Sequence, residues 1–497
     1  MKEAVWGIGN ETERTKSVGS CFSGFSGMNI KEVFLRGEKM KIQREGKAAN
    51  QEQRRELMLN APISRVIPQM AVPTIIAFLI NSIYSMADTY FVTALGTNAT
   101  AAVSVNASLD QVILMCGSML AMGANSYIAR LLGKGDDQKA SQVLSTAFFL
   151  AAGIGLTLTI FGSIFMTPMV RLLGATATCE RYAIEYATYV LLAAPFMAAN
   201  FVMNQCLRSE GSAFLSMMGM SVGGILNCIL DPIFITGLNM GVAGASLATA
   251  LCKLVTFSIL IVPYLKRKSL LHLSIRNFHV TRDIMIEIVG VGSSSMLRSG
   301  LAVVSAIVLN KIAGQISDSV LAGIGVCSKI MMFPFGIILG FGSGFQPVAG
   351  FNWGAKRNDR VAESYRFSSW TAILGSLFLG AILFLPAPAI IRIFAGQDPD
   401  MLRVATLCLR LQCLALPIHG WVVVVNMLCV SLGEARGALL LSTARQGTCF
   451  LPIVFPMGEL WGADGLAGVQ AIADVLTLML AVPLAIRMKR KIKAKQP

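Results

Sequence analysis

About twelve apolar runs follow one another along this sequence, and each is long enough to cross a lipid bilayer as an α-helix. A hydrocarbon core about 30 Å thick takes about 20 helical residues. The runs are continuously apolar, whereas the strands of a membrane barrel alternate between apolar and polar residues. We therefore predict an all-α integral membrane protein with twelve transmembrane helices, near residues 66–94, 103–129, 141–165, 182–206, 212–235, 242–264, 284–310, 321–350, 367–388, 404–430, 437–457 and 465–486.

The composition agrees with a protein that has lipid as its solvent. Hydrophobic residues make up 54% of the chain and charged residues 14%, whereas a soluble domain carries roughly 25% charged residues. The chain has only three histidines and no HExxH motif, and its one GxSxG match, at 219–223, lies inside an apolar run. We therefore expect no enzymatic activity, no cofactor and no zinc site.

The positive charges are distributed unevenly along the chain. Of the 42 Lys and Arg residues, twelve lie between the N-terminus and Arg65, six lie from Arg487 to the C-terminus, and five lie in the loop at 265–283. If the spans alternate in direction, these segments all lie on one side of the membrane, which is the bias typical of cytoplasmic loops. This distribution explains the net charge of +15 and predicts a multi-pass cell-membrane protein with both termini in the cytoplasm, and no nucleic-acid partner.

The sequence repeats itself at an offset of about 220 residues. Three short segments recur in the same order: RLLG at 171–174 as RIFA at 392–395, GKGD at 133–136 as NWGAK at 352–356, and GVAGA at 241–245 as GADGLAG at 462–468. Each repeat holds six spans, an even number, so both copies enter the membrane from the same side. Parallel repeats of this kind are typical of transporters that carry a substrate between two lobes.

These observations divide the chain into five parts. Residues 1–60 are polar and basic and contain no apolar core of a signal peptide, so we expect a disordered cytoplasmic leader. The remaining parts are an N-lobe of six spans at 61–264, a cytoplasmic linker loop at 265–283, a C-lobe of six spans at 284–486 and a basic cytoplasmic tail at 487–497.

Three polar residues stand out within the apolar runs of the N-lobe. Asp88 lies late in the first span, and Asn227 and Asp231 lie in the fifth. A spacing of four residues places Asn227 and Asp231 on one helical face, and a carboxylate in mid-membrane costs roughly 2.5–3.5 kcal/mol. The three side chains are therefore candidates for a proton or small-cation site, although Asp231 could instead cap the fifth span in water and Asp88 could lie at the interface.

Three other polar or flexible side chains within the spans are candidates for a structural or a functional role. Arg298 in the seventh span is either a counter-ion within the C-lobe or an arginine that extends to water. Asn204 could form a hydrogen bond between helices. Met220 could contribute to an adaptable apolar surface or simply pack between helices.

The chain resembles the multidrug and toxic compound extrusion (MATE) family, and its MepA-like branch most closely. The resemblance covers nearly 90% of the chain, from Pro62 to the C-terminus, and includes both halves. Its most distinctive stretches are PTIIAFLINSIYSMADTYFV at 73–92, ARLLGKGD at 129–136, GVAGASLAT at 241–249 and GFNWGAK at 350–356.

The resemblance implies a V-shaped pair of helix bundles and a cation site in the N-lobe. The positions that match this site are Asp88, Asn227, Asp231 and Thr249, which would bind a proton or Na⁺. A substrate cavity is expected at Asn81, Tyr84, Asn204, Met220 and Arg298. Some branches also carry an acidic residue in the seventh span, where this chain has Ser294, Ser295 and Arg298, so we expect coupling to rest on the N-lobe.

The expected function is secondary active efflux. The protein would act as a monomer in membrane lipid and exchange small hydrophobic cationic drugs or dyes against H⁺ or Na⁺ by alternating access. The alternative within the same superfamily is a flippase for a lipid-linked oligosaccharide. A flippase would need a strongly basic cavity for its pyrophosphate, whereas the basic residues of this chain concentrate outside the spans.

Overall fold

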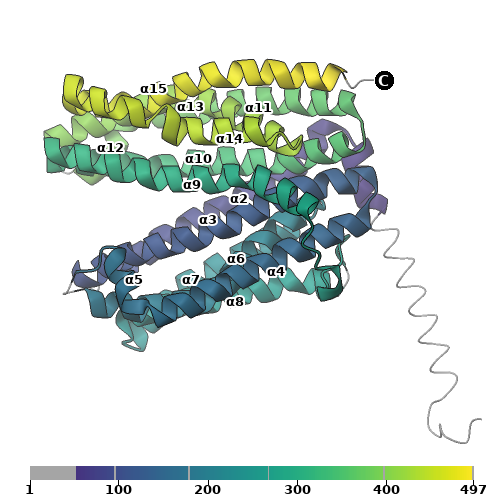
Figure 1. The fold of residues 1–497 in the computed structure, drawn as a ribbon. Coiled ribbons are helices and arrows are strands. Elements are labelled where there is room, and N and C mark those ends of the chain that lie inside the picture. Colours follow the sequence, from purple (N-terminus) through teal and green to yellow (C-terminus); the bar gives the residue numbers. More distant parts are fainter. Residues whose placement is uncertain (1–51, 94–96, 177–178, 267, 396–397, 495–497) are drawn as a thin grey trace, which may run out of the picture. The chain divides into compact units, whose positions relative to one another are not determined.

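A computed structural model describes residues 52–93, 97–176, 179–266, 268–395 and 398–494 (Figure 1). The chain forms two units, Met1–Arg55 and Glu56–Pro497, and only the second is treated below. Within the described residues the regular structure is entirely helical. This confirms the predicted all-α class.

The helices of the first half follow the predicted spans closely. They are α2 (Ile63–Thr93), α3 (Thr97–Lys134), α4 (Asp137–Ile164), α5 (Met166–Leu172), α6 (Glu180–Ser209), α7 (Ala213–Pro232), the π-helical η1 (Ile233–Gly237) and α8 (Gly241–Leu265). We call this set the N-lobe. The short α5 joins the third and fourth spans.

The helices of the second half repeat this order. They are α9 (Arg282–Ile316), α10 (Asp318–Gly354), α11 (Asn358–Phe384), α12 (Ala387–Ala395), α13 (Pro399–Ser431), α14 (Ala435–Thr443), the π-helical η3 (Ala444–Thr448) and α15 (Leu451–Ala494). We call this set the C-lobe. Its short α12 takes the place that α5 has in the N-lobe.

The last two spans form one nearly continuous stretch. By length and apolarity, the described residues contain eleven candidate membrane spans, of which the last, Ala435–Ala494, is 60 residues long. Gly462 within α15 has φ 56° and ψ −131°, a conformation in which a helix cannot continue and which glycine adopts without steric strain. Two spans therefore meet at Gly462, and the predicted number of twelve is confirmed.

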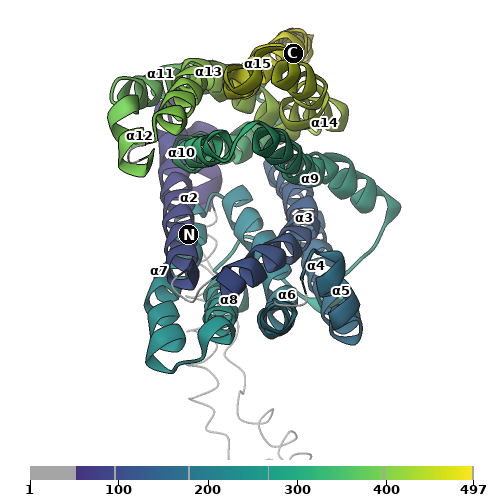
Figure 2. The same ribbon diagram turned by 90° about the vertical axis from the view of Figure 1, so that its left-hand side faces the viewer.

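One helix lies at the centre of each half. In the N-lobe α6 packs against α3, α4 and α8, and in the C-lobe α13 packs against α10, α11 and α15. These two helices are the fourth and tenth spans, and they are the most buried of the candidate spans. The same packing in both halves confirms the predicted duplication (Figures 1 and 2).

The lobes meet along α2 with α10 and along α3 with α9, as the view along the helices shows (Figure 2). Small residues permit this close approach. A Cβ atom on Gly123 would lie 2.0 Å from the carbonyl oxygen of Ile288, and one on Gly292 would lie 2.0 Å from that of Met119. An ion pair also joins α3 to α9, with 2.6 Å between Arg130 Nη2 and Glu287 Oε2.

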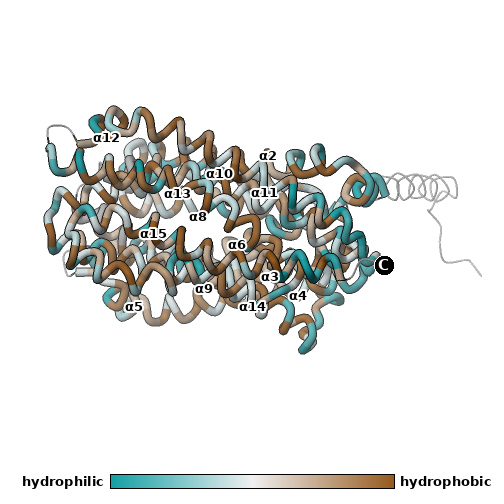
Figure 3. Tube along the Cα trace, turned by 90° about the horizontal axis from the view of Figure 1, so that it is seen from above, coloured by the Kyte–Doolittle hydropathy of each residue, from teal (hydrophilic) through white to brown (hydrophobic). Residues whose placement is uncertain are grey.

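The loop between the lobes packs against α4. The loop between the lobes contains the short 3₁₀-helix η2 (Ile275–Asn277), and its backbone amides at His272 and His279 donate to the hydroxyls of Ser141 and Thr146 on α4. Hydrophilic residues gather at the end of the lobes where α15 finishes (Figure 3).

The disorder expected for residues 1–60 does not extend to the end of that segment. Residues 56–60 are helical, and Met58 is buried with its carbonyl oxygen accepting a hydrogen bond from Asn352. Three apolar residues, 57–59, in a polar and basic segment give little sequence signal for such burial. Residues 1–51 lie outside the described residues.

Candidate functional site

Three of the predicted cation-site residues form one hydrogen-bonded group. Asn227 Nδ2 donates to Asp231 Oδ1 over 3.1 Å and to Thr249 Oγ1 over 3.3 Å. The spacing of four residues on α7 brings Asn227 and Asp231 together, and the neighbouring α8 presents Thr249 to them. Asp231 is fully buried, which excludes the alternative of a water-exposed helix cap.

The backbone beside this group is irregular. Asp231 is followed by Pro232, which has no amide hydrogen to donate, and the π-helix η1 begins at the next residue. π-helical turns are frequent at functional sites. The carboxyl group therefore lies where the helix is interrupted and where backbone groups are less completely paired.

The fourth predicted residue, Asp88, lies on α2, which packs against α7. Its carboxyl group is within electrostatic range of Asp231. One carboxyl oxygen of Asp88 is buried and accepts no hydrogen bond from the described residues. The three helices that were expected to build the cation site therefore bring all four predicted residues into one region.

Two charged residues of this region, Asp110 and Lys253, were missed in the sequence analysis. Asp110 on α3 lies within electrostatic range of both Asp88 and Lys253. Lys253 is one turn beyond Thr249 on α8. Both residues lie inside predicted spans, so the argument that selected Asp88, a charge in an apolar run, would have found them as well.

Lys253 links the carboxyl groups to Tyr84. Lys253 Nζ donates to the Tyr84 hydroxyl over 3.2 Å and lies 5.3 Å from the centre of its ring. The ring packs closely on α7, because a Cβ atom on Gly224 would lie 3.2 Å from Tyr84 Cδ1. The N-lobe therefore holds three carboxyl groups and one ammonium group among residues of α2, α3, α7 and α8.

The group contains more buried acceptors than donors. One oxygen each of Asp88, Asp110, Asn227 and Asp231 is buried without a hydrogen bond from the described residues. An unsatisfied buried acceptor is costly, and a carboxylate in a poorly hydrated site is costlier still. Protonation of a carboxylate, or a cation with oxygen ligands, would remove this cost.

A hard cation would need mixed oxygen ligands in this region. Among the described residues, no group of three or more His, Cys, Asp or Glu side chains is arranged to hold a metal ion. The amide oxygen of Asn227 and the hydroxyl of Thr249 would therefore have to complete any such ligand set. Both are oxygen ligands of the kind that hard cations prefer.

Comparison with known proteins shows which family the chain belongs to. The family described as MatE matches the chain twice, at residues 73–233 and 295–453. The two matched segments begin in the first and the seventh span and together cover more than half of the chain. This chain belongs to the MATE family.

Relatives of this MATE protein match over most of their length. Multidrug export protein MepA of Staphylococcus saprophyticus is 28% identical over 414 residues, which cover 83% of this chain and 91% of the relative. The crystal structure of a MATE protein in complex with MaL6 has a TM-score of 0.83 at 25% identity and covers 88% of this chain and 98% of that chain. An outward-facing multidrug resistance MATE family transporter of the MOP superfamily has a TM-score of 0.82 at 25% identity and covers 89% and 98%.

The predicted cavity residues of this MATE protein do not all lie together. Asn81 and Met220 are half-buried, and Asn81 lies one turn before Tyr84 on α2. Asn204, in contrast, donates from Nδ2 to the carbonyl oxygen of Ser216 over 3.3 Å and accepts from Arg208. Ser216 and Asp231 are near opposite ends of α7, roughly 22 Å apart at 1.5 Å per residue. Asn204 therefore joins α6 to α7 away from the cation site.

The C-lobe contains a polar cluster in which basic side chains, unlike in the N-lobe site, outnumber carboxyl groups. Arg445 in η3 pairs with Asp474 on α15 at 2.6 Å and lies 4.5 Å from the centre of the Phe335 ring. His419 is buried beside the same carboxyl group, with 4.0 Å between Nδ1 and Oδ1 of Asp474. Because Asp474 is already paired with Arg445, a further positive charge beside this cluster has no carboxylate partner within it.

Arg298 supplies that further charge. It is half-buried at the middle of α9, within electrostatic range of His419. Its guanidinium donates to Ser295 Oγ over 3.3 Å, and no carboxyl group of the described residues lies within ion-pair distance. The two interpretations of Arg298, a counter-ion within the C-lobe or an arginine that extends to water, therefore both stay predictions.

Proposed function

We propose that this protein is a secondary active multidrug exporter, which moves amphipathic organic cations out of the cell in exchange for H⁺ or Na⁺. The observation that carries the proposal is the set of four unsatisfied buried oxygens in the N-lobe. A site of this kind has excess negative charge when empty and loses part of that charge when a proton or a cation binds. The printed name of the MepA relative, a multidrug export protein, supports the choice of cargo.

In the proposed cycle, the carboxyl groups of Asp88 and Asp231 alternate between the coupling ion and the organic cation. Two carboxylates in a poorly hydrated site cannot both remain charged without a large electrostatic cost, so ion binding is favoured. Once the coupling ion is bound, the carboxyl groups carry less negative charge and attract the drug less strongly. By linkage, bound drug must weaken the affinity for the ion by the same factor.

Alternating access would come from movement of one lobe against the other. The close contacts of α3 with α9 lie toward the end where α3 finishes and α9 begins, and we assign this end to the cytoplasm. The lobes would then be closed toward the cytoplasm and able to release cargo to the outside. In this proposal both termini lie in the cytoplasm, and the protein acts as a monomer in the cell membrane.

The cargo would be held largely by apolar and aromatic contacts. Tyr84 and Asn81 line the N-lobe side of the proposed cavity, and the flexible Met220 would adapt to ligands of different shape. Arg298 would face the cargo from the C-lobe. A substrate could therefore present its cationic end to the N-lobe and an electron-rich or anionic end to the C-lobe.

The flippase alternative is less well supported. A pyrophosphate would need several unpaired basic side chains converging on the central cavity. Arg445 is already paired with Asp474, and Lys253 lies among three carboxyl groups. In this part of the C-lobe, among the described residues, Arg298 would be the main group available to neutralise the pyrophosphate.

The proposal is tested by ethidium efflux from proteoliposomes with a pH gradient or a sodium gradient imposed separately. We expect efflux to be driven by one of the two gradients and to stop when that gradient is collapsed. Transport under only one gradient identifies the coupling ion. Absence of transport under either gradient would contradict the proposed function and favour the flippase.

A further inference from the structure

A cavity on the outside of the C-lobe has the chemistry of a binding site for a lipid headgroup. It has a volume of about 420 Å³ and is lined by residues of α11, α13 and α15. This volume is within the range of roughly 300–1,000 Å³ that is typical of small-molecule sites. The cavity lies close to the end of the lobe where α15 finishes, away from the cation site of the N-lobe.

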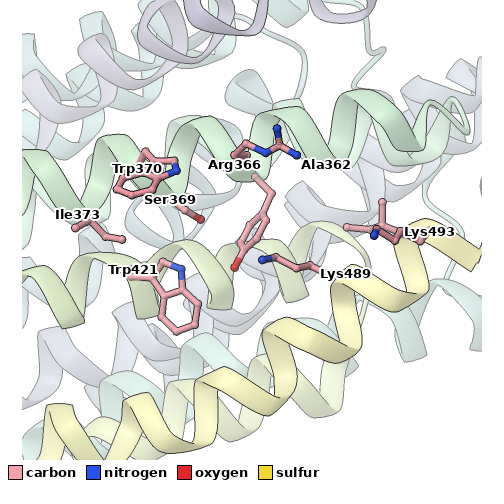
Figure 4. A pocket seen from close by; sticks show the side chains of 10 residues that line it. Ala362, Arg366, Ser369, Trp370, Ile373, Trp421, Lys489 and Lys493 are labelled. Atoms are coloured by element: carbon pink, nitrogen blue, oxygen red, sulfur yellow. The ribbon is translucent and has the colours of Figure 1, made fainter.

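Three basic side chains converge on this cavity from two helices. Arg366 comes from α11, and Lys489 and Lys493 come from successive turns of α15 (Figure 4). All three are exposed, and within the described part of the chain none of them forms an ion pair. The lining contains no carboxyl group, so the cavity is a concentrated region of positive charge.

Aromatic side chains form the remaining wall of the cavity. Trp370, Trp421 and Tyr365 line it, and Lys489 Nζ lies 5.6 Å from the centre of the Tyr365 ring. Tryptophan and tyrosine are typical of the membrane–water interface, where one end of the ring is apolar and the other is hydrated. The combination places the cavity at the level of the lipid headgroups.

An apolar path leads from the cavity along the outside of α11. Trp370 is 62% exposed, Leu374 57% and Phe378 67%, and their spacing of four residues places them on one face of the helix. A groove of about 390 Å³, which shares Arg366 and Trp370 with the cavity, extends to Leu374 and has Glu363 as its only acidic lining residue. This face suits the acyl chains of a lipid whose headgroup lies in the basic cavity.

We propose that this cavity binds an anionic phospholipid of the surrounding leaflet. The phosphate would contact Lys489, Lys493 and Arg366, and the acyl chains would follow the exposed face of α11. Basic pockets between transmembrane helices are suited to anionic headgroups, and each lysine close to the surface contributes measurably to the affinity. A bound lipid would hold α11 and α15 together at their ends.

The test is fluorescence quenching of the full-length protein in vesicles that contain brominated lipids. Bromine on the acyl chains quenches nearby tryptophans, and Trp370 and Trp421 lie at the cavity. We expect brominated phosphatidylglycerol to be preferred over brominated phosphatidylcholine by about fivefold or more, the effect of at least one lysine near the surface. The double variant W370F/W421F should remove most of this difference, because both tryptophans line the cavity.

Two double variants, each lacking two positive charges, distinguish lipid binding in the cavity from a general attraction of anionic lipid to the basic end of α15. The double variant K489Q/K493Q should remove the preference, so that the two brominated lipids quench equally. R487Q/R490Q removes two exposed charges from the same helix outside the cavity and should leave the preference unchanged. Equal quenching by both lipids in the wild type, or equal loss in both double variants, would overturn the proposal. Displacement by millimolar inorganic phosphate would also overturn it, because the site would then bind a free phosphate.

Discussion

At the scale of single residues, the decisive feature is an imbalance of charge inside the membrane. The N-lobe buries carboxyl groups of Asp88, Asp110 and Asp231 beside one ammonium group, that of Lys253. The C-lobe leaves Arg298 without a carboxylate partner among the described residues. Charges of this kind are expensive in a low-dielectric region, so each is expected to meet a mobile partner of opposite charge.

Lys253 is predicted to set the affinity for the coupling ion. Without its positive charge, the three carboxyl groups attract a proton or Na⁺ more strongly. Lys253→Gln should therefore lower the ion concentration for half-maximal efflux by about tenfold, or ~1.4 kcal/mol. Lys253→Arg keeps the charge and should stay close to the wild type. Ion titrations of dye efflux measure the effect, and a rise in the required ion concentration would contradict it.

Arg298 is predicted to recognise an anionic group on the cargo. Rhodamine 110 carries a free carboxylate, and rhodamine 123 is its methyl ester, so the two dyes differ at one group. Arg298→Gln should weaken binding of rhodamine 110 by about tenfold or more, as expected for loss of a hydrogen bond between charged groups. Binding of rhodamine 123 should change little.

Fluorescence anisotropy of the purified variants measures both dyes. Arg298→Lys, which retains the charge, should preserve most of the affinity for rhodamine 110. An equal effect of Arg298→Gln on the two dyes would show that the guanidinium does not contact the carboxylate.

At the scale of helices, the contact between the two lobes depends on glycines, which have no side chain. Gly123 on α3 and Gly292 on α9 allow backbone contact between the lobes, because any Cβ atom would overlap a carbonyl oxygen of the facing helix. Gly344 on α10 allows the same approach to α2, since its Cβ would lie 2.4 Å from Ala71 Cα. The contacts are therefore specific to this arrangement of the two lobes.

Gly123→Ala is predicted to open this contact. The added methyl group should lower stability by about 1–3 kcal/mol, the usual effect of overpacking, and should reduce efflux because the lobes can no longer close here. Gly153→Ala is the matched control, since nothing lies within 4 Å of its Cβ position. Thermal unfolding in detergent, read together with dye efflux, tests the prediction. Equal melting temperatures for the two variants would contradict it.

The helices were largely predictable from sequence because apolar length decides whether a segment crosses the membrane. The span predicted at 242–264, for example, is observed as α8 at Gly241–Leu265. The short α5 and α12 were not predicted, because seven to nine residues give too little periodic signal. Burial of Met58 was missed for a similar reason, since it depends on contacts with distant residues such as Asn352.

The site was only partly predictable, because its members come from four different helices. The spacing on α7 was enough to pair Asn227 with Asp231, and Thr249 followed from the family resemblance. No local pattern could show that Asp474 is already paired with Arg445, or that Asn204 binds the start of α7. These assignments depend on which helix faces which.

At the scale of the whole molecule, two copies of one six-helix design carry different chemistry. The shared design is visible in the equivalent positions of α6 and α13 and in the two matched MatE segments. The N-lobe has an excess of acidic groups and the C-lobe an unpaired guanidinium. In the proposed mechanism, the duplicated helices provide the two lobes that move. The differences between the two copies would then concentrate ion coupling in one lobe.

Efflux by the Asp88→Asn variant is the most direct test of coupling through the N-lobe carboxyl groups. Ethidium efflux from proteoliposomes should be measured for the wild type, for Asp88→Asn and for Asp359→Asn, which neutralises an exposed carboxyl group at the start of α11. The account predicts background efflux for Asp88→Asn, wild-type efflux for Asp359→Asn, and the same melting temperature for all three proteins. Wild-type efflux by Asp88→Asn would contradict the account, because coupling would then not depend on the N-lobe carboxyl groups.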